Sequence, residues 1–481
     1  MEDYKSQFIE RLHQGPLWVG EEPGVNRDLK SKRKSPWFLN VGDAKNAGLL
    51  RALGDAYAGA LIQHYDKFDV VVGIPEKGRE ICSAAMYSIA DKRPDTLWFS
   101  VRKEAKTIGE ASNLSDVDKI KGMVVGEPPK PGMKIVELDD VFTDGTAKYE
   151  FREVLNSLGK LVGGEFEYPL LLIALDRMEV GIGAEGVSAI DSYEQKTGTK
   201  VFSTINALDV VDFRRANNLP VDRMVNYLRV YGTELARARI VGRFGKLEQR
   251  IIENDRSVIP ACDVPLEQFE EIVKATGNLP GIGGYKIPII SGKKGWETWV
   301  GTARKYTTKP LIMDGQKFGT DIPDTGQEVM RNLKEAGFDA VILFPQSGPE
   351  TERAWIYHAF DFELKVIVGG RMTHPGYAVS EGGWITDEGA LNMYRLAARA
   401  GVNNFVVPGN KPEIIKQVRA AIESEGVLNP IFYAPGFIAQ GGKIADTAKV
   451  AGERFHGIVG RGIYEAKDIR AAAIEHTSQL I

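Results

Sequence analysis

The sequence predicts an α/β protein of two domains, an open doubly wound parallel sheet followed by a (β/α)8 barrel. Three observations lead to this prediction. The chain has 481 residues, and at roughly 100–200 residues per domain this length indicates more than one domain. Short β-branched runs alternate with amphipathic helical stretches, which is typical of parallel strands joined by helices. The runs also fall into two series that differ in spacing.

The first series predicts four strands of an open sheet. Its runs are VVVGI at 70–74, LWFSV at 97–101, MKIVEL at 133–138 and LLLIAL at 170–175. Each run is followed by a turn and then by a helical stretch, so we expect the strands to lie parallel. This first domain is placed at residues 1–240.

The second series is longer and more regular. Its eight candidate strands begin near Val258, Gly283, Leu311, Ala340, Lys365, Asn404, Pro430 and Gly457. Their mean spacing of about 28 residues accommodates one helix between neighbouring strands, which favours a TIM barrel. Amphipathic stretches at 324–337 and 388–401 fit such helices. The barrel is placed at residues 257–481, and the charged segment 241–256 is expected to be a helical linker.

The composition of the chain excludes several classes of function. Lys and Arg number 61 against 65 Asp and Glu, a net charge of −4, so neither nucleic-acid binding nor membrane binding is expected. The hydrophobic fraction of 43% excludes a disordered chain. Two distant cysteines, no signal peptide and no apolar run of about 20 residues indicate a cytoplasmic protein. With only six His, we expect an enzyme whose chemistry rests on Lys, Arg and Asp.

The most specific local motif is VELDDVFTDGTA at 136–147. A strand ends in two acids, Asp139 and Asp140, and a turn then opens a helix. The turn consists of Thr143, Asp144, Gly145, Thr146 and Ala147. Free N–H groups in such a turn, together with the helix dipole, bind phosphate, while paired acids suit ribose hydroxyls or a Mg²⁺ held partly by the ligand. The alternative is an ordinary helix cap with surface acids.

Cationic and aromatic residues stand near other strand ends of this domain. A polar segment at 101–113 is interpreted as a cationic lid over a polyphosphate, although a solvated charged face is the alternative. Lys77 and Arg177 follow predicted strands, and Lys30 precedes the aromatic pair Trp37-Phe38. The full set is Lys30, Phe38, Lys77, Arg102, Lys103, Lys106 and Arg177.

Together these segments resemble orotate phosphoribosyltransferases, of the type I phosphoribosyltransferase fold, over roughly residues 8–235. The resemblance implies that Asp139, Asp140 and residues 143–147 bind the ribose and 5-phosphate of phosphoribosyl pyrophosphate (PRPP). It implies a Mg²⁺ carried by PRPP close to the two acids, with no direct protein ligand. Its pyrophosphate-binding residues would be Lys77, Arg102, Lys103 and Lys106, with Lys103 and Lys106 catalytic. Its orotate-binding residues would be Lys30, Phe38 and Arg177.

The same resemblance implies a homodimer or higher homo-oligomer, because the family's lid reaches into the neighbouring subunit's site. One residue departs from the pattern. Ile108 stands where the family usually has a His in the lid, so a proton donor and pyrophosphate contact is missing. A domain that senses PRPP without catalysis is therefore an alternative. The intact acid pair and the complete lysine set argue against it.

In the second domain, charged residues follow several predicted strands. The active sites of (β/α)8 barrels lie at these carboxyl ends. Read in chain order, the candidates are Asp263, Lys286, Asp314, Lys317, Asp321, Thr325, Thr373, Pro435, Gln440, Gly460 and Arg461. Converging charges must be paired, so a structural ion-pair network is the alternative. His374 is assigned no role.

This half resembles orotidine 5′-monophosphate (OMP) decarboxylases, especially archaeal-type ones, through DIPDT, MTHPG, APGFIAQGG and VGRGIY. The resemblance implies a catalytic array of Lys286, Asp314, Lys317 and Asp321, with Asp321 and Thr325 lent by a partner subunit and no cofactor. It implies OMP contacts from Asp263, Lys286, Thr325, Thr373, Pro435, Gln440, Gly460 and Arg461. The spacing D-x-x-K-x-x-x-D is one residue longer than usual on each side of Lys317.

The two resemblances imply consecutive steps of pyrimidine biosynthesis. Orotate and PRPP would give OMP and pyrophosphate, and OMP would lose CO₂ to give UMP. The alternative for the barrel is a related sugar-phosphate decarboxylase or aldolase, which the altered spacing suggests. Lys286 argues against that alternative, because an acidic residue is expected there in the sugar-phosphate relatives.

Overall fold

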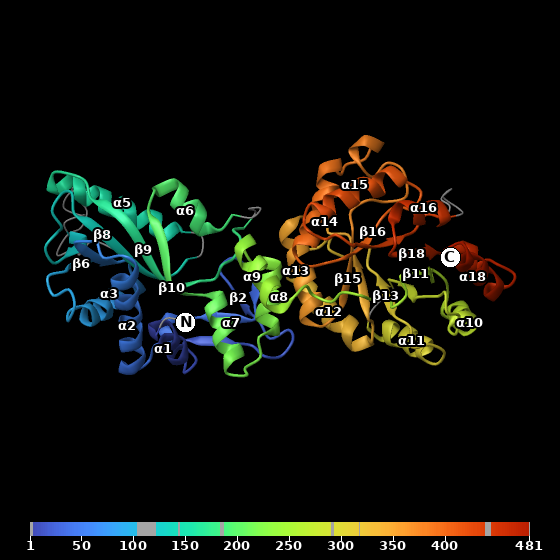
Figure 1. Cartoon of the computed structure of the whole chain (residues 1–481), viewed down its shortest axis with the longest axis horizontal. Helices are drawn as coiled ribbons and strands as arrows, with labels where there is room; N and C mark the ends of the chain where they lie inside the picture. Colours follow the sequence, from blue (N-terminus) through green and yellow to red (C-terminus); the bar gives the residue numbers. More distant parts are fainter. Residues whose placement is uncertain are drawn as a thin grey trace, which may run out of the picture. The chain divides into compact units, whose positions relative to one another are not determined.

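The computed structural model describes residues 3–102, 122–142, 145–182, 187–289, 293–316, 318–437 and 444–480. Contacts divide the chain into two compact units (Figure 1). The first comprises residues 1–21, 25–228 and 232–239, and the second comprises residues 22–24, 229–231 and 240–481.

The first unit contains a six-stranded sheet in the order β10–β9–β8–β5–β6–β7. All neighbouring pairs are parallel except β6 and β7. The strands are β5 (Val70–Gly73), β6 (Leu97–Val101), β7 (Val124–Val125), β8 (Lys134–Val141), β9 (Glu167–Asp176) and β10 (Lys200–Asn206). The predicted doubly wound sheet is confirmed, with one short antiparallel strand added at its edge.

Helices and two small β-pairs complete this unit. β1 (Leu17–Val19) pairs with β4 (Trp37–Leu39), and β2 (Arg27–Asp28) pairs with β3 (Lys34–Ser35). The helices are α1 (Asp3–Leu12), the 3-10 helix η1 (Val41–Asp43), α2 (Ala47–His64), α3 (Lys77–Ile89), α5 (Thr146–Val162), α6 (Ala189–Thr197), α7 (Ala207–Ala216), α8 (Asp222–Tyr231) and α9 (Glu234–Phe244).

The core of the first unit follows the two-residue period of its strands. Val70 and Val72 on β5 face a buried cluster that includes Phe151 and Leu155 of α5 and Tyr193 of α6. The alternate positions of the strands point to the other face, and α3 packs against β5 and β8. Burial on both faces explains why these strands are almost continuously apolar.

The second unit is a closed barrel of eight parallel strands. They are β11 (Arg256–Pro260), β12 (Tyr285–Pro288), β13 (Leu311–Asp314), β14 (Ala340–Leu343), β15 (Lys365–Gly369), β16 (Asn404–Val406), β17 (Ile431–Ala434) and β18 (Phe455–Val459). Parallel bridges from Val258 to Ile282 and from Ala261 to Lys286 join β11 to β12 and close the ring. The predicted barrel is confirmed, and its strands begin within a few residues of the predicted positions.

The helices of this unit follow the strands in turn. They are α10 (Leu266–Thr276), α11 (Lys293–Arg304), α12 (Thr325–Ala336), α13 (Pro349–Asp361), the 3-10 helix η3 (Val379–Glu381), α14 (Asp387–Arg399), α15 (Pro412–Glu423), α16 (Ile444–Ala451), α17 (Arg461–Tyr464) and α18 (Ile469–Ser478). Because each helix returns the chain to the opposite end of the barrel, the carboxyl ends of all eight strands share one face.

The predicted helical linker at 241–256 is wrong for most of its length. Helix α9 ends at Phe244, and residues 245–255 are irregular. Gln249, 2% exposed, accepts a hydrogen bond from Val366 N through Oε1 (3.3 Å), and its carbonyl accepts one from Asn404 Nδ2 (2.7 Å). Ile252 joins the core cluster inside the barrel. The segment therefore covers the amino ends of β15 and β16, and this packing outweighs helix propensity.

This packing makes the linker a determinant of barrel stability. Ile252→Ala is expected to lower the free energy of unfolding by about 2–4 kcal/mol, since Ile252 is 3% exposed and its removal leaves a cavity. Ile251→Ala serves as the control, because Ile251 is only half-buried, and it should lose under about 1 kcal/mol. Urea unfolding followed by circular dichroism measures both. Equal small losses would show that the linker does not support the barrel.

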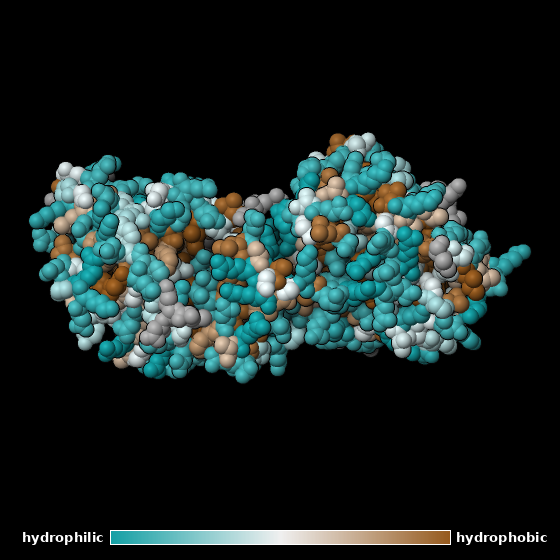
Figure 2. Space-filling view, viewed as in Figure 1, coloured by the Kyte–Doolittle hydropathy of each residue, from teal (hydrophilic) through white to brown (hydrophobic). Residues whose placement is uncertain are grey.

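The surface is consistent with the charge balance. On the face shown in Figure 2, hydrophilic residues predominate and hydrophobic ones form scattered patches. Over the parts of the chain that the structure describes, no helix is both long enough and apolar enough to cross a membrane.

Candidate active sites

The acid pair of the first unit lies at the carboxyl end of β8. Oδ1 of Asp140 accepts a hydrogen bond from Val141 N (2.8 Å), and its Oδ2 is 3.0 Å from Nζ of Lys77, the first residue of α3. Lys77 also donates to Oδ1 of Asn40 (3.3 Å). Because the Lys77 side chain is 48% exposed, this ion pair is open to exchange with an anionic ligand. The structure thus brings Lys77 and Asp140 together.

Asp139 is paired with a different lysine. Its Oδ2 is 2.5 Å from Nζ of Lys148, which also donates to the carbonyl of Val141 (2.8 Å). Both side chains are under 10% exposed. Burial raises the pKa of Asp139, and the ammonium of Lys148 offsets only part of that rise. The Tyr57 hydroxyl donates to the backbone carbonyl of Asp139 (2.5 Å), so this acid is held from both sides.

Helix α5 begins soon after the acid pair. Gly145, at the start of this helix, has φ +80°, a conformation that favours glycine. Behind it, Arg152 of α5 contacts both carboxylate oxygens of the buried Glu137 and donates to Thr199 Oγ1 (3.0 Å). These contacts fix the amino end of α5, with Thr146 and Ala147, beside the acid pair. Such a helix end suits a phosphate.

Part of the predicted PRPP site lies outside the described residues. This applies to Lys103, Lys106, Thr143 and Asp144, and also to the departure at Ile108. Arg102, the residue before this gap, donates to the carbonyl of Gly122 (3.1 Å), and its backbone N–H donates to the carbonyl of Met123 (2.8 Å). Its role stays a prediction.

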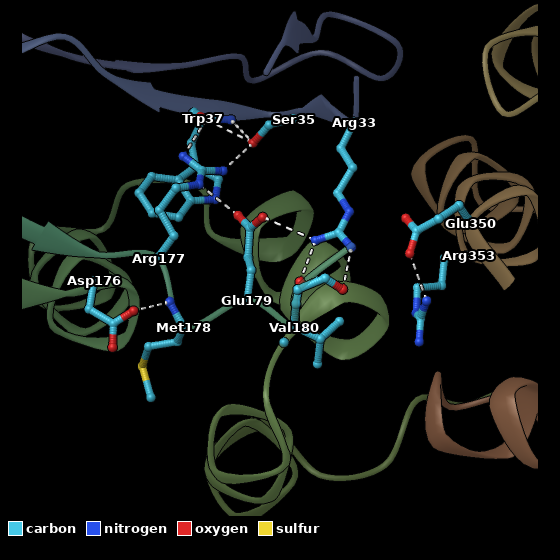
Figure 3. A network of polar contacts seen from close by, with 12 residues as sticks. Arg33, Ser35, Trp37, Asp176, Arg177, Met178, Glu179, Val180, Glu350 and Arg353 are labelled. Carbon is cyan, nitrogen blue, oxygen red and sulfur yellow. Dashed lines mark hydrogen bonds and ion pairs between the residues drawn. The ribbon is translucent and has the colours of Figure 1, made fainter. Parts of the chain in front are cut away.

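Arg177 lies at the end of β9 in a nearly closed polar network (Figure 3). Its Nε is 2.6 Å from Oε1 of Glu179, and its guanidinium donates to Ser35 Oγ (2.8 Å). The guanidinium also stacks on Trp37, 4.0 Å from the ring centroid. Burial lowers the pKa of Arg177, but Glu179 and Tyr227 together raise it by more, so the pKa is raised.

A second arginine approaches the same carboxylate. Arg33 NH1 is 3.6 Å from Oε2 of Glu179 and donates to the carbonyl of Val180 (2.7 Å) (Figure 3). Two guanidiniums thus approach one carboxylate in a largely buried setting.

The other two predicted orotate residues lie on the β1–β4 side of this unit. Phe38 pairs with Trp18 across the two strands, and the Arg27 guanidinium lies over both rings. Lys30 is exposed in the turn between β2 and β3. The main chain of β4 thus connects Phe38 with Trp37, on which Arg177 stacks. Among the residues that the structure describes, Lys30 makes no hydrogen bond or ion pair with this cluster.

In the barrel, Lys286 lies on β12 between two carboxylates. Its Nζ is 3.4 Å from Oδ2 of Asp263, which follows β11, and it also contacts Oδ2 of Asp314, the last residue of β13. Burial lowers the pKa of Lys286, but the two carboxylates raise it by more, so the ammonium form is favoured. The structure brings these three predicted residues together at adjacent strand ends.

The second carboxylate oxygen of Asp314 is not engaged by Lys286. This Oδ1 atom is buried, and among the residues that the structure describes none donates a hydrogen bond to it. Lys317 lies outside the described residues. Close to it in the chain, Phe318 N donates to the carbonyl of Gly315 (2.7 Å), and Phe344 N donates to the carbonyl of Phe318 (2.9 Å). The role of Lys317 and the effect of its longer spacing stay predictions.

Asp321 and Thr325 do not join this group in the single chain. Asp321 is exposed, and its Oδ1 accepts a hydrogen bond from Ile322 N (2.7 Å). Thr325 begins α12 and donates to the carbonyl of Ile322 (2.9 Å). The Ile322 side chain is 59% exposed. This segment therefore exposes both an acid and an apolar side chain to solvent.

The remaining barrel candidates also stand at strand ends. Thr373 follows β15, Pro435 follows β17, and Gly460 and Arg461 follow β18. Arg461 is exposed at the start of the short helix α17. Gln440 lies beyond the described part of the chain. These positions agree with a site at the barrel mouth, and the residue roles stay predictions.

Sequence reasoning missed three side chains that hold these sites together. Lys148 pairs with Asp139, Glu179 pairs with Arg177, and Arg33 approaches the same Glu179. A signal for Lys148 exists, since a lysine in the first turn of the helix after the acid motif can fold back on it. Glu179 is two residues from Arg177, but nothing in the sequence indicates that Arg33 meets it across about 150 residues.

Comparison with known proteins agrees with the division of the chain into two units. A family model described as "Orotidine 5'-phosphate decarboxylase / HUMPS family" matches residues 256–475. Over 234 residues the chain is 35% identical to the orotate phosphoribosyltransferase of Sordaria macrospora, a match that covers 46% of this chain and 91% of the relative. It is 36% identical over 215 residues to that of Aeromonas salmonicida, covering 44% and 88% respectively.

Two solved structures are also similar. An orotate phosphoribosyltransferase from Francisella tularensis is 26% identical with a TM-score of 0.38, over 47% of this chain and 99% of that one. An orotidine 5′-monophosphate decarboxylase from Methanocaldococcus jannaschii is 24% identical with a TM-score of 0.40, over 47% and 98%.

Proposed function

Because the chain belongs to the orotate phosphoribosyltransferase family through its N-terminal half, we propose that it is a bifunctional enzyme of pyrimidine biosynthesis with UMP synthase activity. The first unit joins orotate to PRPP, giving OMP and pyrophosphate. The barrel then removes CO₂ from OMP to give UMP. One observation carries the proposal: a transferase half is followed, in the same chain, by a barrel of the decarboxylase family that holds Asp263, Lys286 and Asp314 together.

In the transferase half, the acid pair receives the ribose hydroxyls, and the amino end of α5 receives the 5-phosphate. Lys77 leaves Asp140 for the pyrophosphate, which it reaches from an exposed position. Arg102, Lys103 and Lys106 complete the pyrophosphate site. As the bond to pyrophosphate breaks, these cations stabilise the charge that develops on the leaving group.

Orotate is held beside β4. Its carboxylate is bound by the guanidinium of Arg177, and its ring stacks against Phe38. Lys30 approaches from the exposed turn between β2 and β3. The contact of Arg177 with Glu179 orients the guanidinium.

The acid pair fits a Mg²⁺ that PRPP brings with it. Asp139 and Asp140 place hard oxygen atoms beside the ribose site, which is the donor type that Mg²⁺ prefers. Each carboxylate already has a lysine partner, so they suit support of a metal bound mainly by the ligand. The bound metal supplies further charge neutralisation for the leaving pyrophosphate.

In the decarboxylase half, loss of CO₂ leaves a carbanion on the pyrimidine ring. Lys317, as ammonium, stabilises that charge and donates the proton. Lys286 binds the ribose and, together with Asp263, orients Asp314 beside the departing carboxylate. Thr373, Pro435 and Gln440 contact the nucleotide, and Arg461 with Gly460 binds its phosphate. This chemistry requires no cofactor.

The enzyme acts as a homodimer or higher homo-oligomer in the cytoplasm. In the single chain, Asp321 is exposed beside the exposed Ile322, and the half-buried Thr325 begins the helix that follows. A partner subunit would place Asp321 and Thr325 in its neighbour's site, and would cover the apolar side chain. The substrates and products are small molecules, so no nucleic acid or membrane partner is required.

Product analysis tests the whole proposal. Incubation of the purified chain with orotate, PRPP and Mg²⁺ is expected to give UMP, with no lasting accumulation of OMP. Accumulated OMP would support the transferase alone and favour a sugar-phosphate decarboxylase or aldolase barrel, the alternative within the matched family. Unconsumed orotate together with measurable PRPP binding would favour a sensing domain in which Ile108 has removed catalysis.

A further inference from the structure

The loop after β15 is held by side chains of the next strand-to-helix loop. Asn410 Nδ2 donates to the carbonyl of Thr373 (3.1 Å), and Lys411 Nζ donates to the adjacent carbonyl of His374 (3.2 Å). Asn410 and Lys411 follow β16 and immediately precede α15. Two neighbouring carbonyls are thus bound by two neighbouring side chains at the barrel mouth.

Lys411 is itself fixed by a chain of ion pairs. Its Nζ is 2.6 Å from Oε1 of Glu381, which lies 3.8 Å from the guanidinium of Arg371. Arg371 is 4% exposed and pairs with Asp387 at the start of α14 (2.6 Å). Burial tends to raise the pKa of Glu381, but Lys411 and Arg371 lower it below its ordinary value. The network therefore stays charged at neutral pH.

The start of the loop is fixed independently. The hydroxyl of the buried Tyr394 accepts a hydrogen bond from Arg371 N (3.1 Å) and donates to the carbonyl of Val406 (2.7 Å). This joins the loop to the end of β16 through one side chain. The start of the loop is therefore held to the end of β16, and its backbone at Thr373 and His374 is held to the loop that follows β16.

We propose that Asn410 and Lys411 are positioning residues for the nucleotide of the decarboxylase. By holding the carbonyls of Thr373 and His374, they keep Thr373 where it meets the pyrimidine nucleotide. The inference rests on the proposed function, since it requires OMP as the substrate of the barrel. It adds two residues that would touch the backbone of the loop and not the substrate. Preorganisation of this kind lowers the ordering that binding must supply.

The test is steady-state decarboxylation of OMP by the full chain carrying Lys411→Met. Loss of a charge-assisted hydrogen bond should raise KM for OMP about tenfold or more. It should leave kcat within about threefold, because the Thr373 contact serves the ground state and the transition state alike. Lys411→Arg keeps the charge and the donors, so it should recover most of the lost affinity.

Lys416→Met is the matched control. It removes the same charge from an exposed lysine of α15 whose ion pair, with Glu413, is a surface contact (2.8 Å), so KM should not change. Asn410→Ala provides a second variant that keeps Lys411 and its ion pairs, with an expected rise in KM of about threefold to tenfold. If Lys411→Met fails to fold, the KM of Asn410→Ala tests the inference instead.

An unchanged KM in both Lys411→Met and Asn410→Ala would overturn the inference. So would a fall in kcat at constant KM, or a Lys411→Arg variant as poor as Lys411→Met, because neither fits a hydrogen bond that positions the substrate. A wild-type chain that does not decarboxylate OMP would instead overturn the proposed function, and this inference with it.

Discussion

Replacing Lys317 with alanine is expected to stop the release of CO₂ from OMP and to leave the formation of OMP intact. In a chain supplied with orotate, PRPP and Mg²⁺, OMP should then accumulate in place of UMP. We expect decarboxylation to fall by at least about a thousandfold, because a single residue would provide both charge stabilisation and the proton. Transferase turnover should stay within about twofold, since it resides in the other unit.

The geometry around Asp314 supplies the physical reason. Lys286 already contacts Oδ2 of Asp314 and forms an ion pair with Asp263. Its positive charge is therefore already balanced by two carboxylates. Oδ1 of Asp314 is buried, with no donor among the described residues. A second ammonium at this oxygen would complete the alternation of charges. Lys317 is three residues further along the chain and is the natural candidate.

Lys317→Arg sharpens the test. Arginine keeps the positive charge but does not release a proton at neutral pH, so it should be nearly as inactive as alanine. Release of ¹⁴CO₂ from carboxyl-labelled OMP measures the effect, and OMP formation in the same preparation controls for folding. Comparable loss of both activities, or CO₂ release near the wild-type rate, would contradict the assignment of Lys317.

The fold was predictable because its signals are local. Short β-branched strands separated by amphipathic helices are set by side-chain periodicity, and the eight barrel strands begin within a few residues of their expected places. The linker was mispredicted because its structure is set by distant partners. Gln249 bonds to Val366 and Asn404, and no pattern within residues 241–256 indicates those contacts.

The same distinction applies to the sites. Asp263, Lys286 and Asp314 were predicted to lie together because each stands near the end of a predicted strand, and the structure places Lys286 in contact with both acids. The meeting of Arg33 with Glu179, and of Lys411 with the carbonyl of His374, depends on how separate loops approach one another. Asp321 illustrates a further limit, because its proposed role in a neighbouring subunit cannot be read from the single chain, where it is an exposed acid.

Replacing both Asp139 and Asp140 with asparagine is expected to have the opposite effect to the Lys317 variant. Orotate consumption should fall by at least about a hundredfold, because the amides keep the shape of the acids and lose their charge. Added OMP should still be converted to UMP at the wild-type rate. The measurement is orotate disappearance at saturating PRPP, with decarboxylation of added OMP as the internal control.

The two acids should not contribute equally to stability. Asp140 pairs with Lys77, which is 48% exposed, so Asp140→Asn leaves a lysine that water can solvate. Asp139 pairs with Lys148, whose side chain is 6% exposed, so Asp139→Asn leaves a buried ammonium without its countercharge. Breaking a buried pair costs about 3–5 kcal/mol. We therefore expect only Asp139→Asn to lower the melting temperature of the transferase unit substantially.

This asymmetry separates a direct role in PRPP binding from a purely structural one. Adding Lys148→Met to the double variant removes the unpaired ammonium and should restore much of the lost stability, because an apolar side chain of similar length tolerates burial. It should not restore orotate consumption if the carboxylates themselves receive the ribose. Recovery of both melting temperature and activity in the triple variant would show that the acids serve only to hold Lys148. The ribose site would then have to be sought elsewhere on the sheet edge.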